Sequence, residues 1–372
     1  MPRVSRRSGV ARALAIAVAA SLALTVGGCS WRNPHLDPAQ AHHRPEGFVN
    51  SDGSRNDKPF STLLSWTWQR WRAGLPSPPS RFVDGYAGFR LATPAPARPR
   101  SEPGAPMVTW IGHATVLLQM GGKNILTDPQ FSGRAFSVQW LGPKRKVPLP
   151  MTVEQLPPID IVVISHSHYD HLDRDTVLAL AARTDNPPEF LVPLGLLPWF
   201  RDLDIERVRA FDWWQSVTIG MVEASFVPAH HWSARTFFDR NRTLWGGWVF
   251  RAPAFSAYFV GDTGCSRDFV EIGRRFGGFD LALIPVGAYE PRWFMADYHV
   301  DPAEAVRIHR DVESNYSIGI HWGSFEMTDE SLDAPIEALA TVLDAQGVAR
   351  NEFELLRHGE TRLLKPRKEH QQ

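Results

Sequence analysis

The residues His166-Ser167-His168-Tyr169-Asp170-His171 follow, after Ser165, a mostly apolar run, Ile159 to Ile164, that is typical of a strand. Side chains alternate across an extended strand, so the first two histidines leave the same face and can reach one ion. The aspartate and the third histidine are adjacent in the following loop, cannot both point at that ion, and suit a second ion nearby. Imidazole and carboxylate ligands together favour zinc, or iron or manganese, over calcium and magnesium. This segment therefore predicts a metal site at the end of a strand.

Three later loops also place a potential metal ligand directly after a predicted strand. In a layered α/β fold such loops meet at one edge of the sheets, where ligands collect. A single histidine in this position is often a core residue, and a Gly-Asp-Thr-Gly sequence is often a plain turn. Together, however, the loops supply the larger ligand number that a two-metal site requires. The candidates are His231 after 221–227, Asp262 after 256–260 and His321 after 317–320.

The rest of the pattern predicts an α/β fold. A Gly121-Gly122 turn between two predicted strands is a hairpin signal. Strands and helices mingle from Ile159 onward, as they do in layered α/β domains. The predicted strands near the start of the domain are 108–110, 115–120 and 123–127, and the predicted helices are 175–183, 267–276, 302–311 and 335–344.

The sequence at 166–171 resembles the His-x-His-x-Asp-His motif of the metallo-β-lactamase superfamily without a gap. Over residues 108–364 the chain is also similar to the family of N-acyl-phosphatidylethanolamine-hydrolysing phospholipases D, and the most specific matching string runs from Tyr289 to Met295. The resemblance implies a metallo-β-lactamase αββα sandwich. Residues 107–372 would form this catalytic domain.

The resemblance also implies a definite set of metal ligands. One metal would be held by His166, His168 and His231, the other by Asp170, His171 and His321, and Asp262 would bridge them. The chain departs from the family at the doubled His230-His231, where the family has a single histidine. His231 aligns better because Trp232 follows it, which leaves His230 outside the ligand set.

Two metal ions, expected to be zinc, imply hydrolysis without a side-chain nucleophile. Two ions about 3.5–4 Å apart can share a water, lower its pKa from about 15.7 toward about 7, and present hydroxide to a phosphorus atom. We expect Asp170 to orient this hydroxide, and His299 to contact the phosphate or protonate the leaving group. Alternatively, His299 only leads into the helix that Asp301-Pro302 is predicted to begin.

These expectations describe a phospholipase D-type phosphodiesterase. It would release N-acylethanolamine and phosphatidic acid from N-acyl-phosphatidylethanolamine. One alternative is a metal-dependent lactonase or phosphodiesterase that acts on soluble substrates, which a product assay would distinguish. A second is a non-catalytic envelope lipoprotein with a vestigial site, which would tolerate missing ligands, although every expected ligand is present.

The first 28 residues are typical of a bacterial lipoprotein signal peptide. Four arginines precede an apolar run at 13–26, which is too short to span a membrane well, and small residues follow it. The sequence Val26-Gly27-Gly28-Cys29 resembles a lipobox, with Cys29 as the lipidated residue. We therefore expect a lipid-anchored protein of the bacterial cell envelope. Ser30 after the cysteine favours the periplasmic face of the outer membrane. The alternative is a soluble secreted protein in which Cys29 is incidental.

Residues 29–106 contain many of the 30 prolines and predict a tether and an N-terminal arm with limited structure. Within this arm, large apolar residues recur at helical spacing. We expect this stripe to pack on the catalytic domain. A membrane-facing stripe is the alternative, because tryptophan favours the interface between lipid and water. The residues are Phe60, Leu63, Leu64, Trp68 and Trp71.

Charge and cysteine content limit the partners. Lys plus Arg and Asp plus Glu are both 40, so the basic excess that marks most nucleic-acid binders is missing. We expect a phospholipid substrate and a membrane surface as partners, and no nucleic acid. Loss of Cys29 to lipid would leave Cys265 without a disulfide partner, as a packed small residue. The oligomeric state stays open.

Overall fold

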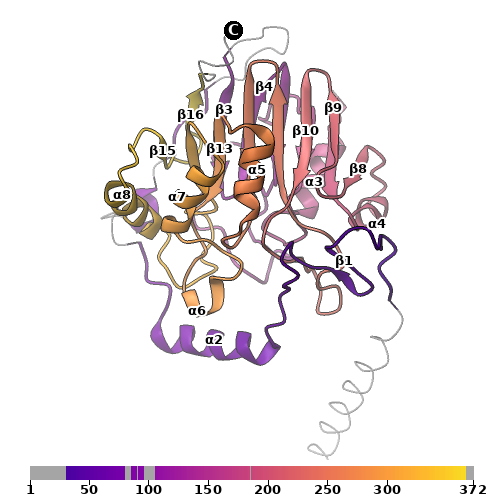
Figure 1. Cartoon of the computed structure of the whole chain (residues 1–372). Coiled ribbons are helices and arrows are strands. Elements are labelled where there is room, and N and C mark those ends of the chain that lie inside the picture. The colour runs from indigo at the N-terminus through magenta and orange to yellow at the C-terminus, as the bar shows by residue number, and fades with distance from the viewer. Residues whose placement is uncertain (1–30, 80–84, 90, 96–104, 185, 366–372) are drawn as a thin grey trace, which may run out of the picture.

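The structure, a computed structural model, describes residues 31–79, 85–89, 91–95, 105–184 and 186–365. Two β-sheets face each other in the middle of the molecule, and helices lie on both outer faces (Figure 1). This is the αββα sandwich that the resemblance implied. The loops at one end of the sheets, nearest to α2 (Phe60–Ala73), contain the residues of the predicted metal site.

The first sheet has seven strands in the order β16-β3-β4-β5-β6-β7-β8. The strands from β16 to β5 pair antiparallel, and those from β5 to β8 pair parallel. Gly121 and Gly122, both with positive φ, form the predicted turn between β4 and β5. The bounds are β3 Met107–Gly112, β4 Thr115–Met120, β5 Lys123–Thr127, β6 Ile161–Val163, β7 Glu189–Pro193, β8 Val208–Phe211 and β16 Thr361–Leu363.

The second sheet repeats this layout with seven strands in the order β15-β14-β13-β12-β11-β10-β9. Its strands pair antiparallel from β9 to β12 and parallel from β12 to β15. The bounds are β9 Ser216–Ile219, β10 Val222–Val227, β11 Gly247–Ala252, β12 Phe255–Phe259, β13 Leu281–Pro285, β14 Ser317–Ile320 and β15 Phe353–Glu354.

Alternation along the strands divides the core into two clusters. In β4, Val116 and Leu118 belong to the larger cluster, which includes residues of both sheets and of the helices on the second sheet. Leu117 belongs to the cluster under the helices of the first sheet. Two helices pack on the first sheet and three on the second. They are α3 Arg174–Ala181 and α4 Leu197–Arg201, then α5 Asp268–Phe276, α7 Pro302–Asp311 and α8 Ala334–Gln346.

Several elements have the bounds that the sequence predicted, namely β4, β5, β14 and α7. At the start of α7, the Asp301 carboxylate accepts hydrogen bonds from the backbone N–H groups of Ala303 and Glu304, both at 2.9 Å. Pro302 occupies the first helical position, where its missing N–H costs nothing. The other predicted elements are present with ends shifted by one to a few residues.

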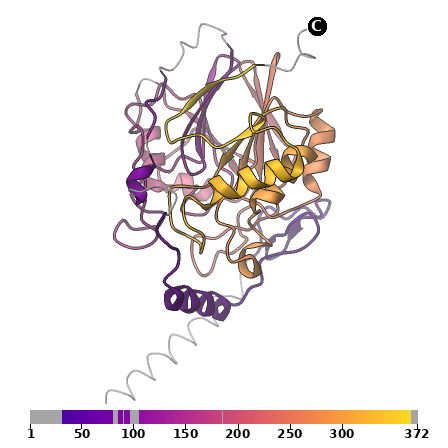
Figure 2. The same ribbon diagram turned by 90° about the vertical axis from the view of Figure 1, so that its left-hand side faces the viewer.

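The N-terminal arm contains the hairpin β1 (His43–Arg44) and β2 (Gly47–Phe48), the helix α2 and the short helix η1 (Gly85–Gly88). The apolar stripe does lie on a helix, but the expectation that it packs on the catalytic domain is largely wrong, although the ring of Phe60 lies 5.9 Å from that of Phe237 in that domain. Every residue of the stripe is exposed, and α2 lies below the body of the molecule (Figure 2). Helical spacing identifies an apolar face, but it does not say what covers that face.

The predicted signal peptide, residues 1–28, and the predicted lipidation site, Cys29, lie outside the described residues. Within the described ranges, no helix has the length and apolar character needed to cross a membrane.

Candidate metal centre

The metal-ligand candidates predicted from the sequence come together in one cluster at the end of the two sheets. The loop after β6 supplies four of them, and the loops after β10, β12 and β14 supply one each. Because these strands end on the same side, residues far apart in the chain meet there. The cluster contains His166, His168, Asp170, His171, His231, Asp262 and His321, together with His113, which the sequence analysis did not include.

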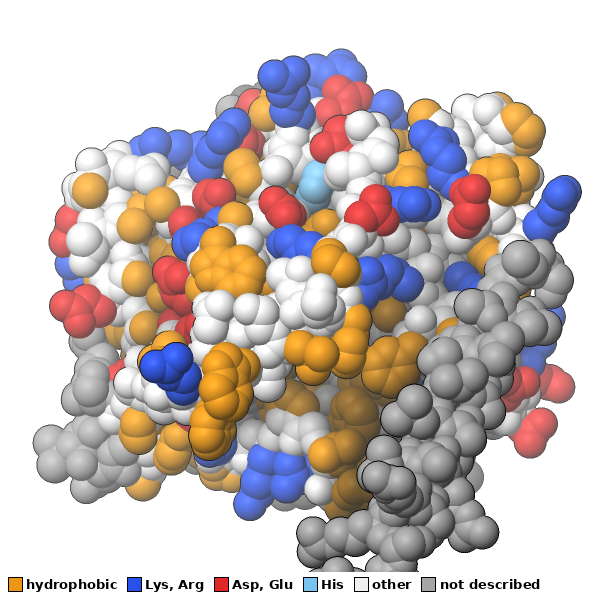
Figure 3. Space-filling model, turned by 90° about the horizontal axis from the view of Figure 1, so that it is seen from below, with side chains coloured by type: hydrophobic (Ala, Val, Ile, Leu, Met, Phe, Trp, Pro, Cys, Tyr) orange, Lys and Arg blue, Asp and Glu red, His pale blue; other side chains and the backbone are white. Residues whose placement is uncertain are grey.

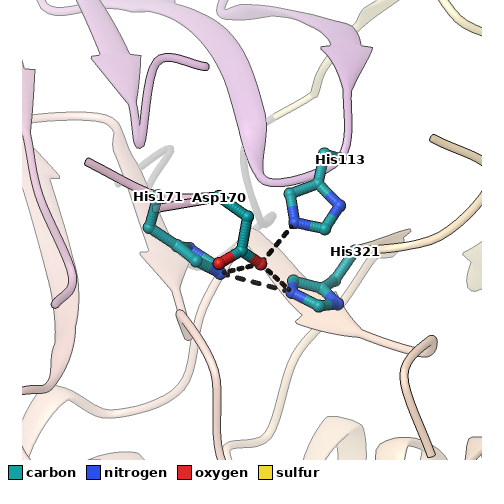
Figure 4. Close-up of side chains that lie close together, drawn as sticks. All are labelled: His113, Asp170, His171 and His321. Carbon is teal, nitrogen blue, oxygen red and sulfur yellow. Dashed lines mark hydrogen bonds and ion pairs between the residues drawn. The ribbon is translucent and has the colours of Figure 1, made fainter. Parts of the chain in front are cut away.

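The first group of ligand atoms surrounds Asp170 (Figure 4). One oxygen of this buried carboxylate, Oδ2, lies 2.9 Å from His113 Nε2, 3.2 Å from His171 Nε2 and 3.3 Å from His321 Nε2. The Nε2 atoms of His171 and His321 are 3.2 Å apart. Three imidazoles therefore direct a nitrogen toward one carboxylate.

The second group consists of His166, His168 and His231. The Nδ1 atom of His168 lies 2.8 Å from His166 Nε2 and 3.4 Å from His231 Nε2. The sequence predicted that His166 and His168 leave one face of the chain and reach the same point. The structure places them so, and His231 completes the group.

Asp262 lies between the two groups. Its Oδ2 atom is 3.1 Å from His171 Nε2 and 3.2 Å from His321 Nε2. The same atom is 4.0 Å from His166 Nε2 and 3.9 Å from His231 Nε2. The carboxylate is thus shared by both groups, which is the position that the resemblance implied for it.

Hydrogen bonds behind the rings decide which nitrogen faces the cluster. Nδ1 of His171 lies 2.6 Å from the Asp128 carboxylate, and Nδ1 of His231 lies 2.9 Å from the carbonyl oxygen of Tyr298. These oxygens can only accept, so each ring carries its proton on Nδ1. Nε2 is then unprotonated in the neutral ring, as a metal ligand requires.

Several polar atoms of the cluster are buried without a hydrogen-bond partner, among them Asp262 Oδ1 and His168 Nε2. A buried carboxylate oxygen without a donor is costly, because burial removes its hydration. Imidazole and carboxylate ligands are those that zinc, iron and manganese bind in proteins. The residues that are present therefore fit divalent metal ions.

The charges of the cluster lead to the same conclusion. Burial lowers the pKa of His168 to about 4 and that of His231 to about 3, so both rings are in the neutral form that binds metals. Burial would raise the pKa of Asp262, but neighbouring histidines hold it well below its ordinary value. Burial would lower the pKa of His321, but the charge of Asp262 and the hydrogen bonds of Asp170 and Asp262 raise it to about 9. The buried carboxylates are therefore ionised and need a positive charge beside them, which a divalent cation would supply.

The backbone is strained where two of the histidines are placed. His113 has φ of 54° and His321 has φ of 63°, a left-handed conformation that is uncommon for residues other than glycine. The backbone N–H of His321 donates to the carbonyl oxygen of His113 at 2.9 Å, which links the two loops. Such strain persists only where surrounding contacts hold it, and it is common at functional sites.

The structure also places the other residues that the sequence singled out. His299 lies beside the cluster, with Nδ1 3.9 Å from Asp262 Oδ2, while Asp301 separately caps α7. His230 turns away from the cluster toward Ser54, with 3.3 Å between its Nε2 and the hydroxyl oxygen. Cys265 is half-buried and packs against the larger of the two core clusters.

Sequence reasoning missed two residues, His113 and Asp128. His113 directly follows the strand β3 and contacts Asp170, and Asp128 directly follows β5 and contacts His171. Both follow a predicted strand, which is the same signal that identified the other residues. Each could have been identified from its position after a strand, but neither has a second potential metal ligand beside it in the sequence.

A second group of histidines and a carboxylate lies outside this cluster. His42 Nε2 and His43 Nε2 lie 2.6 Å and 3.0 Å from the Asp212 carboxylate. However, Nδ1 of His43 accepts a 3.1 Å hydrogen bond from the backbone N–H of Asp37, so the proton of the neutral ring is on Nε2. That nitrogen cannot bind a metal. The group is a clamp that joins the arm to the loop after β8.

A cleft of about 320 Å³ leads from the cluster to the surface. At its inner end lie His168, Asp262 and His299. Its outer walls are mostly apolar and come from α2, from α6 (Arg292–Met295) and from nearby loops. The main apolar residues of these walls are Phe60, Leu63, Trp66, Trp232, Phe294, Met295, Tyr298 and Met327.

Comparisons with known proteins agree with the fold and the cluster. Residues 123–322 match the model of the beta-lactamase superfamily domain. The chain is 43% identical over 250 residues to N-acyl-phosphatidylethanolamine-hydrolyzing phospholipase D 1 of Caenorhabditis elegans, a match that covers 64% of this chain and 70% of that protein. It is 38% identical over 319 residues to an uncharacterized protein of Mycobacterium tuberculosis, covering 82% of this chain and 81% of that protein. A possible metal-dependent hydrolase from Veillonella parvula has the same fold, with a TM-score of 0.57, 18% identity, and coverage of 70% of this chain and 100% of that chain.

Proposed function

This chain belongs to the beta-lactamase superfamily and, within it, to the family of N-acyl-phosphatidylethanolamine-hydrolysing phospholipases D, and we propose that it hydrolyses phospholipid head groups. It is a metal-dependent hydrolase. The proposed substrate is N-acyl-phosphatidylethanolamine, and the products are N-acylethanolamine and phosphatidic acid. The observation that carries this proposal is the cleft, which joins apolar walls to a cluster of histidines and carboxylates.

We propose that the cluster holds two zinc ions. His166, His168 and His231 would hold one, Asp170, His171 and His321 the other, and Asp262 would contact both. Two such cations would lower the pKa of a water molecule and neutralise charge on the phosphoryl oxygens.

The chain's own residues position the substrate. Asp170 lines the cleft, and the hydrogen bond from His113 fixes its orientation, so that it can orient the attacking water. His299 lines the same cleft beside Asp262, where it can contact the phosphate or the leaving oxygen. The apolar walls, with Leu63 and Trp66 from α2, accommodate the acyl chains and exclude water from the reacting phosphate.

The test is hydrolysis of N-acyl-phosphatidylethanolamine vesicles in ¹⁸O-labelled water, with the products analysed by mass spectrometry. Attack at phosphorus with loss of the head group leaves the label in phosphatidic acid, and this is the expected result. Label in the N-acylethanolamine would mean that another bond is cleaved. Turnover of lactones or soluble phosphodiesters without turnover of phospholipid would favour the soluble-substrate alternative.

We further propose that residues 1–28 form a signal peptide, 29–106 a lipid-anchored arm and 107–372 the catalytic domain. The anchor at Cys29 would hold the protein at the periplasmic face of the outer membrane of a bacterial envelope. Metabolic labelling with a fatty acid should label the wild-type protein and not Cys29→Ser. A wild-type protein without label would contradict the anchor and leave the proposed reaction untouched.

A further inference from the structure

Large apolar side chains gather on the face of the molecule that α2 presents. On α2, Trp68 is 58% exposed and Trp71 is 71% exposed. A neighbouring loop adds Phe237 and Phe238, and the ring of Phe237 lies 5.9 Å from that of Phe60. We call this surface the apolar rim, and it consists of Phe60, Leu63, Leu64, Trp68, Trp71, Phe237 and Phe238.

The helix is fixed to the domain by a different face. The Trp66 ring stacks on that of Phe294 at 4.8 Å, and its indole N–H donates to the Asp329 carboxylate at 3.0 Å. One turn later, the Arg70 guanidinium donates to the carbonyl oxygens of Glu326 and Met327 at 3.1 Å and 2.7 Å. These contacts hold the helix in one position on the domain. In that position the apolar rim is exposed.

The apolar rim is continuous with the cleft. Phe60 and Leu63 belong to the rim and also line the cleft whose inner end contains His168 and Asp262. Figure 3, which views the molecule from below, shows hydrophobic side chains gathered on this face around a hollow. A molecule that leaves the rim can thus move toward the metal centre along an apolar wall.

The charges on α2 itself suit phospholipid head groups. The helix α2 contains no acidic residue, and its last turn is basic, with Arg72 exposed. The exposed Arg240 lies close to Phe238 in the chain and lines the cleft. Tryptophan is enriched at the interface between lipid and water, and helices of this kind lie in the plane of that interface.

We propose that the apolar rim docks on the leaflet of a phospholipid bilayer with an anionic component. In this arrangement the rim enters the boundary of the acyl chains and the arginines meet lipid phosphates. A phospholipid then moves from the leaflet into the cleft without passing through water. The docking surface stands on the exposed residues alone, whereas the delivery of substrate rests on the proposed function.

The test measures binding to vesicles that contain no substrate. The protein is the mature chain, residues 29–372, with Cys29→Ser, so that neither the signal peptide nor a lipid anchor contributes. The vesicles contain phosphatidylcholine and phosphatidylglycerol in equal parts. We expect this parent protein to sediment with the vesicles. The double variant Trp68→Ser and Trp71→Ser should bind at least about tenfold more weakly, because two indole rings no longer enter the interface.

The matched control is Met221→Ser. Met221 is 54% exposed in the turn between β9 and β10, at the end of the molecule opposite α2 (Figure 1). Its removal should leave vesicle binding unchanged. All substituted side chains are exposed, so folding should be retained, and circular dichroism checks this. Equal binding by the parent and the double variant would overturn the proposal.

A second measurement separates docking from the reaction. The double variant should lose turnover of lipid in vesicles and keep the turnover of a short-chain, water-soluble phosphodiester. If the parent binds vesicles but hydrolyses no phospholipid, the proposed function fails and the docking surface stands. If light scattering instead shows a dimer that the double variant abolishes, and no vesicle binding, then the rim is a contact between copies and the docking proposal is wrong.

Discussion

Asn50, in the N-terminal arm just after β2, accepts through Oδ1 a 3.0 Å hydrogen bond from the backbone N–H of His231. The same oxygen accepts a 2.9 Å hydrogen bond from the indole N–H of Trp245. Asn50 is buried, and so is His231. A residue of the arm, outside both sheets, thus takes part in placing a predicted metal ligand.

Replacement of this amide should weaken the metal centre. Asn50→Ala leaves the buried backbone N–H of His231 without this acceptor, at a cost of about 1–3 kcal/mol, whereas the indole N–H of Trp245 keeps a 3.1 Å hydrogen bond to the carbonyl oxygen of Ala229. We expect a lower melting temperature and weaker zinc binding, measured by competition with a chromogenic chelator. Asn50→Asp keeps an acceptor oxygen and should retain more of both. Wild-type stability and zinc affinity in Asn50→Ala would show that the arm does not support the centre.

Removal of a central ligand should remove both metal and activity. Asp262 contacts both groups of histidines, and His168 contacts the other two members of its group. Asp262→Ala and His168→Ala should each lose at least one equivalent of bound metal, measured by elemental analysis, together with phospholipid turnover. Prolonged chelation of the wild-type protein should have the same effect, and added zinc should reverse it. Wild-type turnover by either variant would contradict the assignment of these residues as metal ligands.

The carboxylate of Asp128 should control metal affinity from behind the centre. It accepts from His171 Nδ1 at 2.6 Å and from the backbone N–H of Ser165 at 2.7 Å. Substitution of such partners commonly costs about 10–100-fold in metal affinity, and we expect a loss in this range for Asp128→Asn. The control is Asp280→Asn, a buried carboxylate that accepts from the backbone N–H of Ser256 at 2.7 Å. Equal zinc affinities for the two variants would show that Asp128 does not control metal affinity.

The clamp between the arm and the loop after β8 should weaken as the pH falls. Burial lowers the pKa of His43 below its ordinary value of 6.5, so below that pH the unfolded chain binds a proton that the folded clamp excludes. Burial would raise the pKa of Asp212, but the hydrogen bond from His42 and the charges of both histidines lower it below 3.8. Stability from this carboxylate is therefore present at neutral pH and is lost in stronger acid.

Limited proteolysis of the arm measures this effect. Cleavage should become faster as the pH falls from 7 through 6.5 toward 5, and His43→Gln should flatten the profile. His309→Gln serves as the control, because burial also lowers the pKa of that histidine, to about 4, but its ring contacts Ser317 in the second sheet. A wild-type cleavage rate that does not change with pH would contradict the assignment.

The sequence predicted those parts of the molecule that short-range rules determine. The Gly121-Gly122 turn fixes the hairpin of β4 and β5, and the Asp301-Pro302 pair fixes the start of α7. The candidate ligands could be identified because each follows a strand, and strands that end at one edge bring their loops together.

The remaining features depend on contacts that spacing does not encode. His113 enters the cluster because its backbone is left-handed, and the contacts that hold this conformation come from His321, far along the chain. The position of α2 depends on the hydrogen bonds that Trp66 and Arg70 make with the loop 326–329, which is far away in the sequence. The sequence marks these residues as apolar or basic, but it does not say which of them find a partner.

The candidate ligands are divided between the two sheets. His113 and the loop after β6 belong to the first sheet, whereas His231, Asp262 and His321 belong to the second. A cation shared by ligands of both sheets would act as a cross-link between the halves of the sandwich, in the way that a disulfide joins two segments. Loss of the ion would then loosen the attachment of one half to the other, and the cohesion of the protein would depend on the supply of metal around it.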